Sequence, residues 1–259
     1  MFNRFWRIAT MTTAAGAACL SGVAAGCDCP ETAEIRVLAA ASLHDVVREI
    51  AAEFSAEHGG HVRVQSAASS VLARQIRARA RCDVFISADA ETMAPLVVDG
   101  LIDAASLALV ARNRLVLAAP PGNPAGLRSL DDLRAPAARR VALCGEAVPL
   151  GRYARAVLRT TGNEKLLATA VIVDDARAAL AALEHGAVDA AFLYASDARP
   201  ERVFVVAELH DSQQPAIEYH AGCTPDAGPV AERFLAYLLQ PRAQAALARA
   251  GLTPGDAAP

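Results

Sequence analysis

The sequence predicts an α/β protein with mixed, mostly parallel sheets flanked by helices. Apolar runs of strand length alternate with segments whose apolar residues recur at helical spacing, and short loops join them. The 259 residues suffice for a large core and for two lobes. No flexible Gly/Ser linker interrupts the pattern. Two lobes joined by strands that cross between them would account for that absence.

The first strand and helix of the predicted core meet at a serine. Residues 37–41 form an apolar run suited to a buried strand, and Ser42 follows as a helix N-cap. Apolar residues then recur at helical spacing, at Leu43, Val46, Val47, Ile50, Ala51 and Phe54. A strand that leads directly into a helix N-terminus presents a hydroxyl and unpaired backbone N–H groups together, which suits an anion.

The same arrangement recurs in the next strand and helix. Residues 62–66 are predicted as a strand, Ser69 and Ser70 follow, and residues 71–76 have helical spacing. A single serine at a helix start is usually only a cap. Two of them in successive βα units, however, could direct two helix N-termini at one crevice at the carboxyl edge of a parallel sheet.

The remaining elements follow from the same patterns. Strands are predicted at residues 83–87, 114–119, 140–144, 171–173, 190–194 and 202–208. Helices are predicted at 91–99, from Ser129 onward for a short stretch, and at 152–160, 176–184, 229–239 and 241–250. Asp174 and Asp175 form the acidic start of the helix at 176–184, where the helix dipole favours carboxylates.

Composition and motifs exclude several functions. A net charge of −3 gives no reason to expect a nucleic-acid partner. The chain contains no Gly-x-Ser-x-Gly elbow, Walker A loop, His-Glu-x-x-His motif or dinucleotide glycine fingerprint. The six histidines are scattered, which favours surface roles over metal binding. The protein is therefore not expected to be an enzyme, and no cofactor is expected.

Residues 1–27 have the plan of a secretory signal peptide. Arg4 and Arg7 precede a stretch of apolar and small residues that ends in Ala-Ala-Gly-Cys27. This ending also resembles a bacterial lipobox, in which Cys27 would carry the lipid and anchor the protein to the inner membrane. Without Cys27 and the signal residue Cys19, four cysteines remain, whose pairing the sequence leaves open: Cys29, Cys82, Cys144 and Cys223.

Several blocks of the chain, taken together, resemble one family, the periplasmic molybdate-binding proteins of ABC uptake systems. The matching blocks are Val37–Leu43, Ala68–Ile76, Asp83–Asp89, Val148–Ala154, Asp175–Leu180 and Phe192–Ala198. The resemblance runs in order from Glu34 to Leu252. It implies a two-lobed class II periplasmic binding protein fold, with residues 34–112 and 222–252 in the first lobe and 113–221 in the second.

The resemblance also implies a site of neutral donors that holds molybdenum as its oxyanion. Ser42 and Ser69 would donate through hydroxyl and backbone N–H groups, Leu150 and Ala176 through backbone N–H alone, and Tyr194 through its phenol. Leu150 stands where the family usually has Ala, and Ala176 where it often has Val. The stretch at residues 219–223 departs from the family's Tyr-Pro-x-Ala pattern.

The function implied is that of a monomeric periplasmic protein, which captures molybdate or tungstate and delivers it to an ABC permease in the inner membrane. One alternative is a binder of a smaller tetrahedral oxyanion such as sulfate. A second is an enzyme that acts on a phosphorylated or sulfated metabolite. Such an enzyme would need a nucleophile activated by a base.

Overall fold

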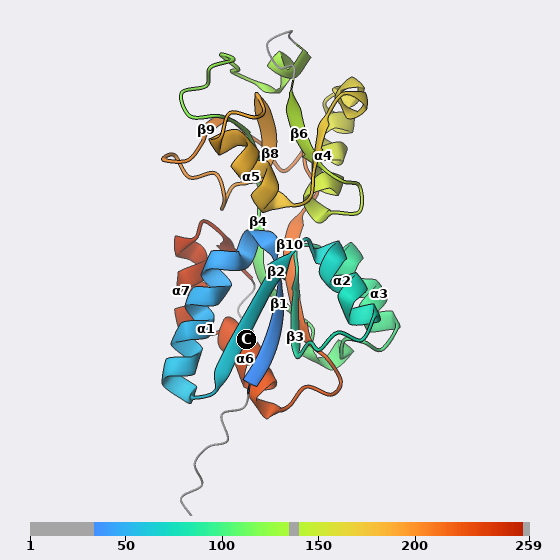
Figure 1. The fold of residues 1–259 in the computed structure, drawn as a ribbon, viewed down its shortest axis with the longest axis vertical. Helices are drawn as coiled ribbons and strands as arrows, with labels where there is room; N and C mark the ends of the chain where they lie inside the picture. Colours follow the sequence, from blue (N-terminus) through green and yellow to red (C-terminus); the bar gives the residue numbers. More distant parts are fainter. Residues whose placement is uncertain (1–33, 135–139, 256–259) are drawn as a thin grey trace, which may run out of the picture. The chain divides into compact units, whose positions relative to one another are not determined.

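The described chain forms two β-sheets. The structure is a computed structural model that describes residues 34–134 and 140–255. The predicted signal peptide, Cys27 and Cys29 lie outside the described residues. Within the described residues, eleven strands form a six-stranded sheet and a five-stranded sheet, both mixed and flanked by helices (Figure 1).

The six-stranded sheet has the strand order β11-β4-β10-β3-β1-β2. Its strands are β1 (Glu34–Ala40), β2 (His61–Ala67), β3 (Val84–Ser87), β4 (Ala108–Asn113), β10 (Ile217–Cys223) and β11 (Thr253–Pro254). Strand β1 pairs in parallel with β2 and β3, whereas β10 is antiparallel to β3 and β4. The carboxyl ends of β1, β2 and β3 therefore lie at one edge of the sheet.

Helices cover both faces of this sheet (Figure 1). They are α1 (His44–His58), α2 (Ser69–Arg77), α3 (Ala90–Val98), α6 (Pro229–Leu238) and α7 (Pro241–Arg249). Because side chains alternate along a strand, Leu38 packs with α2 and α3 through Leu72 and Met93. Its neighbour Val37 belongs to the larger core with Ile50 of α1.

The five-stranded sheet has the order β7-β6-β8-β5-β9. Its strands are β5 (Leu115–Ala119), β6 (Val141–Cys144), β7 (Val171–Val173), β8 (Ala190–Tyr194) and β9 (Phe204–Glu208). Helices α4 (Pro149–Thr160) and α5 (Ala176–Glu184) pack against it. Every residue of β5, β6 and β8 is buried. These strands are apolar along their whole length, which is typical of strands covered on both faces of the sheet.

The chain crosses between the two sheets twice. Strand β4 ends at Asn113 in the first sheet, and β5 begins at Leu115 in the second. After β9 the chain returns at Ile217, where β10 rejoins the first sheet. The sequence analysis did not identify β4 or β10, since both contain polar residues. The first four residues of β10 alternate between buried and half-buried positions, and its last three residues are buried.

Smaller features complete the description. Short 3₁₀ helices lie at η1 (Ala41–Leu43), η2 (Ala104–Ser106), η3 (Leu130–Arg134) and η4 (Glu164–Ala168). The helix predicted from Ser129 is η3. In the described part of the chain, Cys82, Cys144 and Cys223 are buried free thiols. None of the helices in that part is both long and apolar enough to cross a bilayer.

Candidate functional site

All five residues that the sequence analysis named as binding residues line one small cavity. Its walls come from the starts of η1, α2, α4 and α5 and from the end of β8, and the space within it that a water-sized sphere can reach is about 10 Å³. The lining residues are Ala40, Ala41, Ser42, Ala68, Ser69, Ala88, Val148, Pro149, Leu150, Asp175, Ala176 and Tyr194. The two sheets thus contribute to the same cavity.

The first sheet supplies two serine hydroxyls at the carboxyl ends of its parallel strands. Ser42 lies in η1 after β1, and its Oγ is 3.0 Å from the Tyr219 hydroxyl. Ser69 is the first residue of α2, and its Oγ accepts a hydrogen bond of 3.0 Å from the backbone N–H of Ala88. Each hydroxyl is therefore held by a distant part of the chain.

The prediction that Ser42 caps the following helix is wrong. The residues before η1, α1 and α2 are Ala40, Leu43 and Ala68, and none of these helices has a side-chain cap. The physical reason is that the serine hydroxyls are engaged in tertiary hydrogen bonds. The first backbone N–H groups of these helices therefore lack a side-chain cap, and like those of every helix they have no partner within the helix itself.

The second sheet supplies two further helix starts. Helix α4 begins at Pro149 directly before Leu150, and proline suits this position because it lacks an N–H group. At the next residue, Gly151, a Cβ atom would lie 2.2 Å from the Gly145 carbonyl oxygen. A glycine is therefore needed for the start of α4 to pack against this loop.

Helix α5 begins at Ala176 as predicted. The Asp175 side chain caps it by accepting a hydrogen bond of 2.9 Å from the backbone N–H of Ala178. Among the described residues that line the cavity, Asp175 is the only one with a charged side chain. Because this carboxylate is engaged at its own helix start, the cavity offers positive potential from helix N-termini without a cation.

Tyr194, the last residue of β8, is buried, and its hydroxyl has no hydrogen-bond partner within the described chain. Burial raises the pKa of the Tyr194 phenol well above its ordinary value, so the group stays protonated at neutral pH. An unpaired buried hydroxyl costs free energy unless a ligand or water completes it. Tyr194 is thus a donor without an acceptor at the edge of this cavity.

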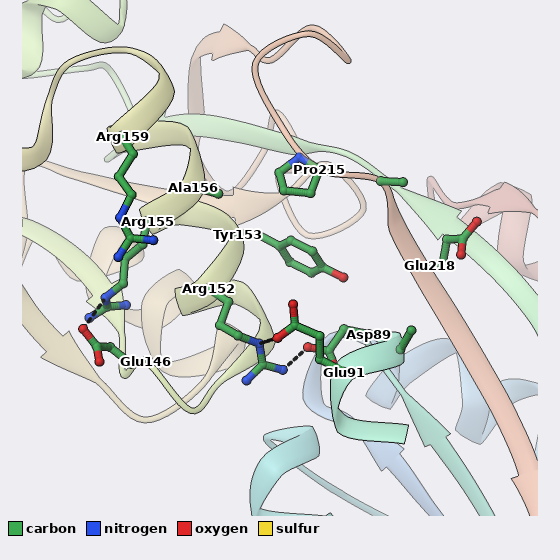
Figure 2. A pocket seen from close by; sticks show the side chains of 12 residues that line it. Asp89, Glu91, Glu146, Arg152, Tyr153, Arg155, Ala156, Arg159, Pro215 and Glu218 are labelled. Atoms are coloured by element: carbon green, nitrogen blue, oxygen red, sulfur yellow. Dashed lines mark hydrogen bonds and ion pairs between the residues drawn. The ribbon is translucent and has the colours of Figure 1, made fainter. Parts of the chain in front are cut away.

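A larger, open hollow of about 530 Å³ lies beside α4. Figure 2 shows its Arg152 directed at Asp89 and Glu91, and its Arg155 directed at Glu146. The guanidinium groups of Arg152 and Arg155 are thus already paired, and the carboxylates would repel an anion. Asp89 is itself buried and accepts from the N–H of Thr92 at the start of α3. This hollow is therefore a less suitable anion site than the small cavity.

The small cavity presents mainly hydrogen-bond donors. Apart from the Asp175 carboxylate, which caps α5, its polar groups are hydroxyls and backbone N–H groups, and a tetrahedral oxyanion offers only acceptor oxygens when fully ionised. No cluster of His, Cys, Asp and Glu in the described residues could hold a metal ion.

This combination of two bridged mixed sheets and a shared cavity is the two-lobed fold of periplasmic solute-binding proteins. The chain belongs to the family of bacterial extracellular solute-binding proteins, whose model matches residues 35–253. It is 33% identical over 247 residues to the molybdate-binding protein ModA of Escherichia coli strain K12, which covers 92% of this chain and 96% of that protein.

Two solved structures show the same fold. The substrate-binding domain of a putative molybdenum ABC transporter from Clostridium difficile matches with a TM-score of 0.67 and 26% identity, over 86% of this chain and 100% of that one. The periplasmic molybdate-binding protein of Azotobacter vinelandii matches with a TM-score of 0.76 and 23% identity, over 85% and 98%. The relatives are solute-binding proteins rather than enzymes.

The carboxyl group of Asp197, just after β8, predicts a pH dependence of stability. Asp197 follows β8, and its Oδ2 is buried without a hydrogen-bond partner in the described chain. Burial raises the pKa of Asp197 to about 7, although Arg177, Arg202 and Arg199 act in the opposite direction. The folded protein therefore keeps a proton that the unfolded chain loses near pH 4.

Because the folded state binds the extra proton, the free energy of unfolding should fall as the pH rises from about 4 to about 7. Asp197→Asn should remove this fall, because asparagine does not titrate. At pH 8 it should raise the free energy of unfolding by roughly 2–4 kcal/mol, since each unit of pKa shift corresponds to about 1.4 kcal/mol. Urea unfolding of both proteins at pH 5, 6, 7 and 8 measures the difference. The matched control is Asp226→Asn, at an exposed turn. Parallel pH profiles for wild type and Asp197→Asn would contradict the prediction.

Proposed function

We propose that this protein captures molybdate, and also tungstate, outside the cytoplasm and delivers it to an ABC permease. The observation that carries the proposal is the buried, unpaired hydroxyl of Tyr194 in a cavity surrounded by helix N-termini. A fully ionised tetrahedral oxyanion supplies the acceptors that these groups lack. The similarity to molybdate-binding proteins over nearly the whole chain supports the same ligand.

In this proposal each binding residue has a separate role. Ser42 and Ser69 donate through their hydroxyls and backbone N–H groups, and Tyr194 donates through its phenol. Leu150 and Ala176 donate only through the backbone, so their side chains shape the wall of the cavity. Molybdenum is held through its oxygen atoms, and no protein atom coordinates it.

The proposed lobes comprise residues 34–112 with 222–252, and residues 113–221. Strand β10, which spans the end of this second range, pairs with β3 and β4 of the first sheet. Ion pairs connect elements of the first sheet to helices of the second: Asp45 of α1 pairs with Arg177 of α5, and Asp89 and Glu91 at the start of α3 pair with Arg152 of α4. They would stabilise the arrangement in which both lobes contact the ligand.

The proposed setting is the periplasm, where the protein acts as a monomer and is anchored through a lipid on Cys27 when the lipobox is processed. The enzyme alternative is disfavoured by the surroundings of Ser42. The hydroxyl of Ser42 contacts the Tyr219 phenol, which is no general base at neutral pH because burial raises its pKa further. A sulfate binder remains the closer alternative, and titration separates the two.

The proposal predicts size-selective oxyanion binding. The purified protein, freed of bound anion by dialysis, should bind molybdate and tungstate one to one in calorimetric titration. Sulfate and phosphate should give no measurable heat under the same conditions. Tight binding of sulfate with no response to molybdate would replace the proposed ligand with the smaller oxyanion.

The two serines should each contribute measurably to binding. Ser42→Ala and Ser69→Ala should each weaken molybdate binding by about 1.5–3 kcal/mol, the range for hydrogen bonds to a charged group. The matched control is Ser70→Ala, since Ser70 is the next residue of α2 but does not line the cavity. Unchanged affinity in both cavity variants, each with a native melting temperature, would refute the assigned site.

A further inference from the structure

A chain of buried hydrogen bonds leads from the crossing strands to the cavity. The Tyr219 hydroxyl on β10 lies 3.0 Å from Ser42 Oγ and 3.2 Å from Asn113 Nδ2, at the end of β4. Asn113 Nδ2 also donates to Ser196 Oγ at 2.9 Å. Tyr219, Asn113 and Ser196 are all buried. The hydroxyl of Ser42 is therefore set by residues that do not line the cavity themselves.

The orientation of the Asn113 side-chain amide is determined by its other contact. The backbone N–H of Arg114 donates to Asn113 Oδ1 at 2.9 Å, and a backbone N–H can only donate. The oxygen of the amide must therefore face Arg114. Its nitrogen, which can only donate, then faces Tyr219.

This orientation gives the chain a direction. The Tyr219 oxygen accepts from Asn113, so its own proton is free to point at Ser42 Oγ. Ser42 Oγ then accepts, and its proton is left to point into the cavity that it lines. If Ser42 instead donated to the Tyr219 oxygen, the proton of Tyr219 would have to point at the side-chain NH₂ group of Asn113. That group cannot accept a hydrogen bond, so the proton would be left unpaired.

The backbone supports this position of Tyr219. The pairing of β10 with β4 shifts register between Tyr219 and His220. Such an irregularity redirects a side chain and is frequent beside functional sites. Burial also raises the pKa of Tyr219 well above its ordinary value, so the phenol keeps its proton over the physiological range.

We infer that Tyr219, held by Asn113, is a positioning and specificity residue that makes the Ser42 hydroxyl a donor to the ligand. This inference rests on the proposed function. It adds that the ligand oxygen beside Ser42 must carry no proton, because the Ser42 oxygen already accepts the proton of Tyr219. A ligand that carries an O–H group, such as hydrogen phosphate, finds no acceptor at this point and leaves its proton unpaired.

The direct test is a double-mutant cycle between Tyr219 and Ser42, read by calorimetric titration with molybdate. Tyr219→Phe should weaken binding by about three- to tenfold, the loss expected for one buried hydrogen bond. In a Ser42→Ala background the same substitution should change the affinity by less than about twofold, because Tyr219 acts through Ser42. Tyr237→Phe, on α6, is the matched control and should bind as the wild type does.

Ligand choice gives a second readout that a purely structural role would not change. With Tyr219→Phe the Ser42 oxygen can accept a proton from the ligand, so the ratio of molybdate to phosphate affinity at pH 8 should fall. Equal losses of molybdate affinity with and without the Ser42 hydroxyl would overturn the inference, as would an unchanged affinity in Tyr219→Phe.

Asn113→Asp provides an independent variant if Tyr219→Phe does not fold. A carboxylate would still accept from Arg114 but would also accept from Tyr219, so Ser42 would lose its free proton. The loss of molybdate affinity should be larger in the native background than in the Ser42→Ala background. An equal loss in both backgrounds would reflect charge repulsion alone and would overturn the inference.

If the wild-type protein binds no molybdate, the proposed function fails, and the inference fails with it. If the wild type binds molybdate and the cycle is additive, only the role of Tyr219 is refuted. The wild-type titration thus separates the two outcomes.

Discussion

The central constraint is that an anion must be held without a countercharge. Among the described residues that line the cavity, none carries a positive side chain, so stabilisation must come from fixed donors at helix starts and from hydroxyls. Such donors are effective only when they are oriented before the ligand arrives. The structure meets this need with tertiary hydrogen bonds, from Ala88 to Ser69 and between Tyr219 and Ser42.

Small residues and ion pairs fit the same constraint. Ala40 and Ala68 line the cavity without adding bulk, and Gly151 lets the start of α4 pack against the Gly145 carbonyl. Arg152 and Arg177, which do not line the cavity, instead pair with carboxylates of elements that flank the first sheet. Charged side chains therefore join the two sheets, and the proposed ligand contacts are neutral donors.

Local pattern predicted much of this arrangement. The alternation of apolar runs predicted β1, β6 and β8, and acidic residues predicted the start of α5, since these signals lie within a few adjacent residues. The resemblance to the molybdate-binding family named Ser42, Ser69 and Tyr194, which the structure places in the wall of one cavity. The contact of Ser42 with Tyr219 joins residues 177 positions apart, so no local pattern could indicate it. That contact is also why the predicted N-cap was wrong.

The most direct measurement is a crystal structure of the protein with molybdate, with the metal located by anomalous diffraction at the molybdenum edge. The account predicts one molybdenum site in the small cavity, with oxygen atoms about 3 Å or less from the hydroxyls of Tyr194, Ser42 and Ser69. A molybdenum site beside Arg152 and Arg155, with the Tyr194 hydroxyl still unpaired, would contradict it.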